Sequence, residues 1–208
     1  MSTGGGEGDW APERGAPAEE QEGTDGAAFT HVGGETVYSG RIVDVRIERF
    51  RHADGEEVSR EVIRHQGAVA IVAHDERRVW LVRQPREAVG EQALLEIPAG
   101  RLDVAGEEPL QAAQRELAEE IGRGARRWEP ILSYWAGAGI TDEQVHLYLA
   151  TDLYEAHASS DENERIELVP WPLLRLDDAI AECRDAKTLI GLLWLARRLD
   201  ARSRAHGR

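Results

Sequence analysis

Cysteine is nearly absent from this sequence, because Cys183 is the only one among 208 residues. A single cysteine excludes an intrachain disulfide and a cysteine-rich zinc site. The sequence also lacks an apolar run of membrane-spanning length and a basic-then-apolar leader at its start. We therefore expect neither a transmembrane helix nor a signal peptide. These absences together predict a cytoplasmic protein.

A concentrated positive charge is absent as well. The formal net charge is −14, and the basic residues do not gather into a Lys- or Arg-rich stretch. A negative charge of this size opposes nonspecific binding to nucleic acids and to anionic membranes. We therefore expect no nucleic-acid partner and no membrane partner. An acidic protein can still act on phosphate esters when metal ions neutralise the site.

Composition divides the chain into four parts. Residues 1–28 are rich in Gly, Ala, Pro and Glu, and their acidic side chains face a single basic one, Arg14. Low hydrophobicity with high net charge predicts a disordered acidic tail. Residues 29–65 are predicted to form a small N-terminal β-sheet, residues 66–200 the main domain, and residues 201–208 a flexible C-terminus.

Hydrophobic patterning predicts strands in both folded parts. Apolar and polar residues alternate over 42–50, and residues 58–65 are expected to return as the partner strand after the turn 52–55, which is typical of a hairpin. The continuous apolar run 68–73 instead predicts a strand buried on both faces. Further strands are expected at 36–38, 79–84, 94–97, 128–134, 144–150 and 168–172, and helices at 176–182 and 186–199. This order predicts an α/β protein with a mixed β-sheet between helices, an α/β/α sandwich, beside a small N-terminal antiparallel sheet.

The most informative stretch is residues 100–122, GRLDVAGEEPLQAAQRELAEEIG. Its second half is predicted to be helical, because apolar residues recur there at three- and four-residue spacing and Gly122 marks an end. Glu116 and Glu120 are four residues apart and therefore share one helix face, with Glu119 beside them. Like charges at this spacing repel each other. We therefore expect a hard divalent cation with oxygen ligands to compensate them.

The order of Gly100, Glu107 and the run RELAEEIG resembles the Nudix box of the Nudix hydrolase family. The resemblance implies the Nudix fold and metal-dependent hydrolysis of a diphosphate linkage. It implies about two or three Mg²⁺ or Mn²⁺ ions per site as cofactors. By this resemblance the principal metal ligands are Glu116 and Glu120, with Glu119 as an additional ligand and the carbonyl of Ala99 completing the shell. The resemblance also implies that Arg115 orients a box glutamate through a charge-assisted pair.

A later segment resembles the ADP-ribose pyrophosphatase-like branch of that family. Residues 161–171, DENERIELVPW, are similar to the loop that supplies the general base in this branch. The resemblance implies that Glu162 is the base and that Glu164 is a further metal ligand. A glutamate beside metal ions and water can accept a proton at neutral pH without unusual tuning of its pKa.

Three other segments resemble the same branch. Arg60-Glu61-Val62 is similar to a segment that contacts the adenine end of the substrate across a dimer. Gln84-Pro85-Arg86 is similar to a segment whose arginine approaches the phosphates or the terminal ribose, and residues 185–188, DAKT, are similar to the start of the last helix. The resemblance therefore implies substrate binding by Arg60, Glu61 and Arg86. It also implies a homodimer, which fits the N-terminal sheet because so small a sheet is only marginally stable alone.

The loop after the box leaves the substrate open. Residues 137–143, GAGITDE, keep the glutamate of the branch, Glu143, which the resemblance assigns to substrate binding. They have Ala138 where the branch usually has a proline, and proline would fix the shape of the loop. One interpretation is hydrolysis of ADP-ribose, or a related nucleoside diphosphate sugar, to AMP and ribose 5-phosphate. A broad-specificity or GDP-sugar pyrophosphatase is the alternative within the class.

Two further functions are weighed against these. A non-catalytic ligand sensor on the Nudix fold would belong to a different class, but such regulators tend to lose the box glutamates and to gain a DNA-binding domain. This chain keeps the glutamates and has no basic appended domain. A hydrolase of oxidised dGTP is also conceivable, although enzymes of that kind are usually shorter and lack the N-terminal sheet.

Overall fold

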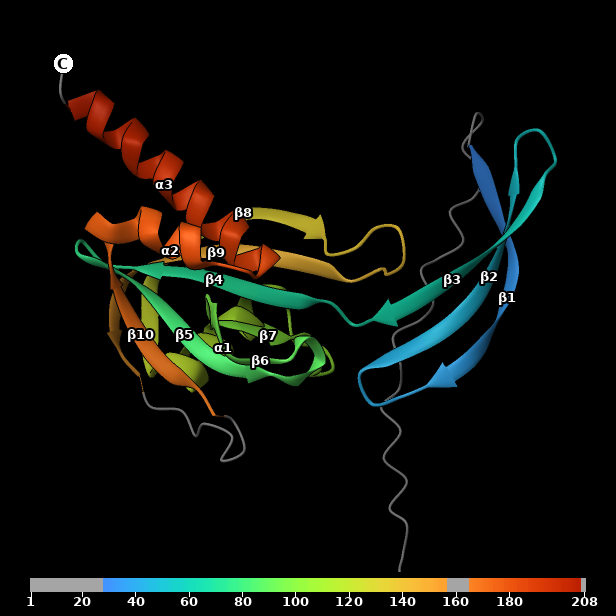
Figure 1. The fold of residues 1–208 in the computed structure, drawn as a ribbon, viewed down its shortest axis with the longest axis horizontal. Helices are drawn as coiled ribbons and strands as arrows, with labels where there is room; N and C mark the ends of the chain where they lie inside the picture. The colour runs from blue at the N-terminus through green and yellow to red at the C-terminus, as the bar shows by residue number, and fades with distance from the viewer. Residues whose placement is uncertain (1–27, 157–164, 207–208) are drawn as a thin grey trace, which may run out of the picture.

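The protein forms two β-sheets with helices on the larger one (Figure 1). The computed structural model describes residues 28–156 and 165–206. Apart from Ala28, the predicted acidic tail lies outside the described residues, as does the candidate loop at 161–164. Within the described ranges, none of the helices is both long and apolar enough to cross a membrane.

The main sheet is seven-stranded and mixed. It comprises β4 (Ala68–His74), β5 (Arg78–Arg86), β6 (Glu91–Glu96), β7 (Ala99–Arg101), β8 (Arg123–Trp135), β9 (Gln144–Glu155) and β10 (Glu167–Pro172). The strand order is β10-β5-β4-β9-β8, with β6 beside β5 and β7 beside β4. Strands β4 and β9 pair in parallel, and the other pairs run antiparallel. The short strand β7 was not predicted, because an Ala-Gly-Arg sequence has little strand propensity.

Helices cover both faces of this sheet, which confirms the α/β/α layering (Figure 1). Helix α1 (Pro109–Ile121) packs on one face, and α2 (Leu176–Glu182) and α3 (Ala186–His206) pack on the other. Strand β4 contributes to both cores, since Ile71 lies in the core under α1 and Val72 in the core under α3, both fully buried. The prediction of a strand buried on both faces is confirmed. Two short 3₁₀ helices, Glu87–Val89 and Leu173–Arg175, complete the connections.

Helix α1 begins and ends as its sequence predicts. The side-chain oxygen of Gln111 accepts a hydrogen bond from the backbone N–H of Glu108 at 3.0 Å, which satisfies one donor at the helix start. At the other end Gly122 adopts a left-handed φ of 64°, and its N–H bonds to the carbonyl of Ala118 at 3.1 Å. Leu117 is fully buried against the sheet. This burial fixes the rotation of α1 and hence the direction of its carboxylates.

Helix α3 differs from its prediction in length and in its buried stripe. It continues to His206, although a flexible C-terminus was expected from residue 201. Its last turns are rich in Ala and Arg, which are strong helix formers. Leu192 and Leu195 are fully buried, whereas Leu193 is exposed. The sequence pattern predicts an apolar stripe at Leu189, Leu192, Leu193 and Ala196, which is right for Leu192 and wrong for Leu193.

The small sheet stands beside the main sheet and is joined to it through the end of its third strand (Figure 1). It consists of β1 (Phe29–Ser39), β2 (Val43–His52) and β3 (Glu57–His65), all antiparallel. The predicted turn is present, with Gly55 at a φ of 89° and its N–H bonded to the carbonyl of His52. Strand β1 is longer than the predicted 36–38. The strand continues through a bulge next to Gly33, and the pair Gly33-Gly34 has too little strand propensity for the sequence to predict this extension.

A carboxylate is buried inside this small sheet. Glu48 is 1% exposed, although the alternating pattern of β2 placed it on the polar side. It accepts hydrogen bonds from Arg46 at 2.6 Å and Arg64 at 2.9 Å, and it bonds to His31 at 2.8 Å. Gly34 makes room for it, since a Cβ there would lie 2.0 Å from Oε2 of Glu48. Burial alone would raise the pKa of Glu48, but the bonds from Arg64, His31 and Arg46 outweigh it and lower the pKa to about 2.

Candidate active site

Arg115 connects the carboxylates of α1 with the loop before it. Its Nε and Nη2 donate to the two carboxylate oxygens of Glu107 at 3.0 and 2.9 Å. Its Nη1 donates to Glu116 at 2.7 Å and to Glu119 at 3.0 Å. The bond to Glu107, followed by the contacts with the other acids, raises the pKa of Arg115. A permanent positive charge thus holds together acids that would otherwise repel one another.

The segment before the box lies directly against two of the predicted ligands. The backbone N–H of Ala99 donates to Oε2 of Glu120 at 3.0 Å. A Cβ at Gly100 would lie 1.9 Å from Cδ of Glu116, which is far closer than any real contact. Glycine at this position is therefore what allows the carboxylate to approach the backbone. The structure therefore brings Ala99 and Glu120 together through a hydrogen bond from the amide of Ala99. The role predicted for the carbonyl of Ala99, as a metal ligand, stays a prediction.

The donor chemistry of this face fits a hard divalent cation. Glu116, Glu119 and Glu120 provide carboxylate oxygens on one face of α1, the donors that Mg²⁺ and Mn²⁺ prefer. Within the described ranges, no three acidic, His or Cys side chains converge closely enough to ligate one ion. In the described structure Arg115 donates hydrogen bonds to Glu116 and Glu119, and the amide of Ala99 donates one to Glu120.

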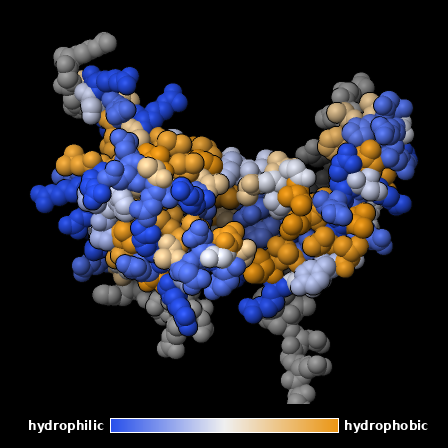
Figure 2. Space-filling view, in the orientation of Figure 1, coloured by the Kyte–Doolittle hydropathy of each residue, from blue (hydrophilic) through white to orange (hydrophobic). Residues whose placement is uncertain are grey.

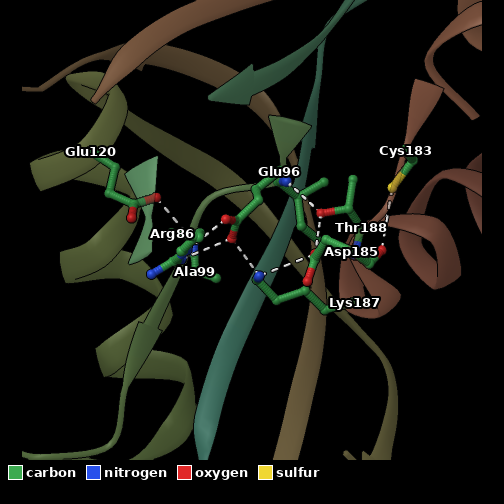
Figure 3. Close-up of polar contacts among 9 residues, drawn as sticks. Arg86, Glu96, Ala99, Glu120, Cys183, Asp185, Lys187 and Thr188 are labelled. Atoms are coloured by element: carbon green, nitrogen blue, oxygen red, sulfur yellow. Dashed lines mark hydrogen bonds and ion pairs between the residues drawn. The ribbon is translucent and has the colours of Figure 1, made fainter. Parts of the chain in front are cut away.

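Arg86 approaches the same region from the end of β5 (Figure 3). Its Nε and Nη2 donate to the two oxygens of Glu96 at 2.6 and 2.8 Å. This bidentate pair raises the pKa of Arg86, and the charges of Glu120 and Asp185 act in the same direction. The structure therefore places the predicted substrate-binding arginine within the electrostatic reach of Glu120.

Glu96 and Lys187 belong to this site and were missed as functional residues. Glu96 is fully buried and also accepts a hydrogen bond from Nζ of Lys187 at 2.5 Å. The only signal in the sequence is a lone acid between Leu95 and Ile97, within the short apolar stretch 94–97. The DAKT run was recognised as a helix start, but its lysine received no role.

The start of α3 also fixes the strand that leads to the box. The carboxylate of Asp185 accepts hydrogen bonds from the backbone N–H of Thr188 at 3.0 Å and from its hydroxyl at 2.6 Å, as an N-cap does. The hydroxyl oxygen of Thr188 in turn accepts the N–H of Ile97 at 2.9 Å. Ile97 is two residues before Ala99, so α3 holds the segment that contacts the box glutamates.

The loop after the box, residues 136–143, is bonded to the end of β3. The N–H of Ile63 donates to the carbonyl of Ile140 at 2.8 Å, and the N–H of Asp142 donates to the carbonyl of Ile63 at 3.2 Å. The Asp142 carboxylate accepts the N–H of His65 at 2.8 Å and Arg64 at 2.9 Å. Glu143, the predicted substrate-binding residue of this loop, therefore lies where the two sheets meet.

Four predicted residues are not brought to this site by the described chain. Arg60 and Glu61 lie on β3 with exposed side chains, and in the described residues no hydrogen bond or ion pair joins them to α1. Figure 1 shows their sheet apart from the box helix. Glu162 and Glu164 lie outside the described residues.

The chain belongs to the NUDIX domain family. The family model, described as NUDIX domain, matches residues 64–188, which include the box helix, Arg86 and the loop after the box. The family prediction made from the box is therefore confirmed. The matched residues include all strands from β4 to β10.

Individual relatives agree with this assignment. An ADP-ribose pyrophosphatase of Bacillus subtilis (strain 168) is 36% identical over 169 residues, covering 77% of this chain and 89% of the relative. One of Mycobacterium tuberculosis is 40% identical over 141 residues, covering 67% and 68%. These relatives place the chain among the Nudix hydrolases. A crystal structure described as an ADP compounds hydrolase shares the fold, with a TM-score of 0.75, 24% identity, and coverage of 86% of this chain and 97% of that one.

Proposed function

We propose that this protein hydrolyses the diphosphate linkage of ADP-ribose to AMP and ribose 5-phosphate, or that of a closely related nucleoside diphosphate sugar to the corresponding nucleoside monophosphate and sugar phosphate. One observation carries the proposal. The carboxylate face of α1 lies against the Ala99-Gly100 segment, with the guanidinium of Arg86 in the field of Glu120. Acidic metal ligands beside a fixed arginine are what an anionic diphosphate requires. The names of the two pyrophosphatase relatives support ADP-ribose as the substrate.

In this proposal each residue has a separate task. Glu116, Glu119 and Glu120, with the carbonyl of Ala99 and Glu164, hold Mg²⁺ or Mn²⁺, and Arg115 keeps the box carboxylates in place. When bound, the divalent ions neutralise the diphosphate and lower the pKa of a coordinated water. Glu162 accepts the proton of the attacking water. Arg86 binds a phosphate or the terminal ribose, and Glu143 contacts the substrate from the loop after the box.

A substrate panel tests the proposed reaction. Hydrolysis of ADP-ribose, ADP-glucose, GDP-mannose, NADH and 8-oxo-dGTP would be measured with Mg²⁺ and compared as kcat/KM. We expect ADP-ribose to lead by about tenfold or more, a ~1.4 kcal/mol preference in transition-state binding. A lead for GDP-mannose, or equal values across the panel, would show that Ala138 and its loop have widened the specificity. A protein that binds diphosphates and cleaves none would be a ligand sensor instead.

We also propose that the protein is a homodimer that assembles through the small sheet. Figure 2 shows apolar side chains gathered on that sheet. Phe29, Val37, Tyr38 and Ile42 each expose more than half of their surface. Exposed apolar area of this kind favours association with a partner that covers it. Arg60 and Glu61 of one protomer would then reach the substrate of the other.

The dimer prediction is checked by light scattering and activity together. The wild-type protein should have the mass of a dimer, and Val37→Asp should lower the mass towards the monomer and weaken the binding of ADP-ribose. Leu174→Asp is the matched control, because Leu174 is a fully exposed apolar residue in the connection after β10. A wild-type monomer with full activity would contradict the proposal.

A further inference from the structure

Glu96 is a fully buried carboxylate between two cations (Figure 3). Arg86 donates to both of its oxygens, at 2.6 and 2.8 Å, and Nζ of Lys187 lies 2.5 Å from Oε2. Burial by itself would raise the pKa of Glu96, but Arg86 and Lys187 outweigh it and lower the pKa. Glu96 therefore stays ionised inside the protein, next to the arginine that the substrate needs.

The charges of this cluster balance only when Lys187 is present. Lys187 lies 3.0 Å from Oδ2 of Asp185 as well as against Glu96. Arg86 and Lys187 together offset Glu96 and Asp185, so the four side chains are neutral as a group. Without Lys187 the group would carry one negative charge beside Glu120 and beside the proposed diphosphate site. That charge would repel an anionic substrate and would draw Arg86 more closely to the acids.

One edge of the Arg86 guanidinium is bonded to Glu96, and the other edge is available to a ligand. Nε and Nη2 are bonded to Glu96, while Nη1 has no hydrogen-bond partner among the described residues. Its side chain is 40% exposed, whereas Glu96 is fully buried. A planar guanidinium fixed in this way presents its remaining N–H groups in a defined direction, which suits a phosphate oxygen.

Lys187 is also the only lysine in the sequence. Lysine and arginine together number 25, so 25 − 1 = 24 of the basic residues are arginines. An ammonium group is compact and can lie between two carboxylates, whereas a guanidinium is a larger planar fork. The one position that is lysine is therefore the one where a compact cation must fit between Glu96 and Asp185, with only 18% of its side chain exposed.

We propose that Lys187 is a positioning residue for substrate binding, which offsets the buried charge of Glu96 and thereby leaves the guanidinium of Arg86 available to the phosphates of the substrate. The inference rests on the proposed function, because it takes a diphosphate as the ligand of Arg86. Lys187 acts through Glu96 and Arg86 and touches neither substrate nor metal.

The first test is Lys187→Met, which keeps the length of the side chain and removes its charge. We expect the KM for ADP-ribose to rise about tenfold with kcat changed by less than about twofold, because uniform binding of the anion is lost while the metal-binding face is intact. Lys187→Arg keeps the charge and should fall between wild type and Lys187→Met, since its fork fits the gap poorly. An unchanged KM in Lys187→Met would overturn the inference.

A double variant separates the charge effect from a structural one. In Lys187→Met/Asp185→Asn one positive and one negative charge are removed together, so the neutral balance of the cluster is restored while the bidentate pair of Arg86 and Glu96 stays in place. We expect its KM to return to within about threefold of wild type. If Lys187 were merely structural, the second substitution would leave KM raised or raise it further, and the thermal midpoint would fall with it.

Binding without turnover keeps this test distinct from that of the proposed function. Calorimetric titration with ADP-ribose in EDTA should show an affinity about tenfold weaker for Lys187→Met than for wild type. In a protein that already carries Arg86→Gln, adding Lys187→Met should not weaken the affinity further. A wild-type protein that neither binds nor cleaves a diphosphate would refute the proposed function. A wild-type protein that binds and cleaves ADP-ribose, together with unaltered binding in Lys187→Met, would refute only the role of Lys187.

Discussion

We expect Glu120→Gln to lower kcat/KM for ADP-ribose by about a thousandfold, or ~4 kcal/mol, while the fold is retained. The amide oxygen of glutamine can still accept the N–H of Ala99, which Glu120 accepts at 3.0 Å. The negative charge for a divalent cation is lost, however. Removing one of two like charges four residues apart should also relieve repulsion on α1.

Two measurements check this prediction together. Steady-state kinetics with Mg²⁺ should show the loss of activity, and thermal denaturation should show that added Mg²⁺ raises the midpoint of wild type but not of the variant, because a ligand stabilises only the state that binds it. Glu76→Gln is the matched control, an exposed glutamate in the turn between β4 and β5. A Glu120→Gln enzyme within tenfold of wild type would remove Glu120 from the metal site.

The second large effect should be on stability. Glu48→Gln should lower the free energy of unfolding by about 3 kcal/mol at pH 7, because the pKa of Glu48 falls from 4.5 to about 2 on folding. Since the folded pKa is below the unfolded one, this contribution is complete above about pH 4.5 and is lost as the pH falls towards 2. The difference between wild type and variant should therefore shrink on acidification.

Glu57→Gln is the matched control for this experiment. Glu57 pairs with Arg51 on the same sheet, but both side chains are about half exposed, so the pair should be worth less than about 1 kcal/mol. Urea denaturation of both variants and wild type at several pH values between about 3 and 7 provides the comparison. Equal losses for the two variants, or a Glu48→Gln deficit that does not change with pH, would contradict the assignment.

The parts of this fold that follow from local sequence were predictable. Helix α1 is specified by its own apolar spacing and by Gly122, and β4 by an unbroken apolar run, so a short window contains the information. The predicted ligands Glu116, Glu119 and Glu120 lie on one helix face for the same reason. The hairpin at 52–55 is likewise a local signal.

The contacts that depend on distant residues were not predictable. Glu96 and Lys187 are 91 positions apart, and nothing in either neighbourhood indicates the other. Glu48 was placed on the polar side of β2, because alternation assigns a face but does not show that Gly34 and two arginines enclose it. In the proposed dimer Arg60 and Glu61 reach the substrate of the other protomer, and a pattern within one chain contains no distance between two chains.

The hydrogen bonds between Ile63 of β3 and the loop at 136–143 have a consequence for how this enzyme class diversifies. The loop that contains Glu143 is held in place partly by hydrogen bonds to a strand of the small sheet. A substitution on the small sheet can therefore displace Glu143 while every residue of α1 stays the same. With Glu143 in the substrate-binding role proposed above, substrate preference and hydrolytic chemistry are separately adjustable in this protein, and selection can alter the first without altering the second.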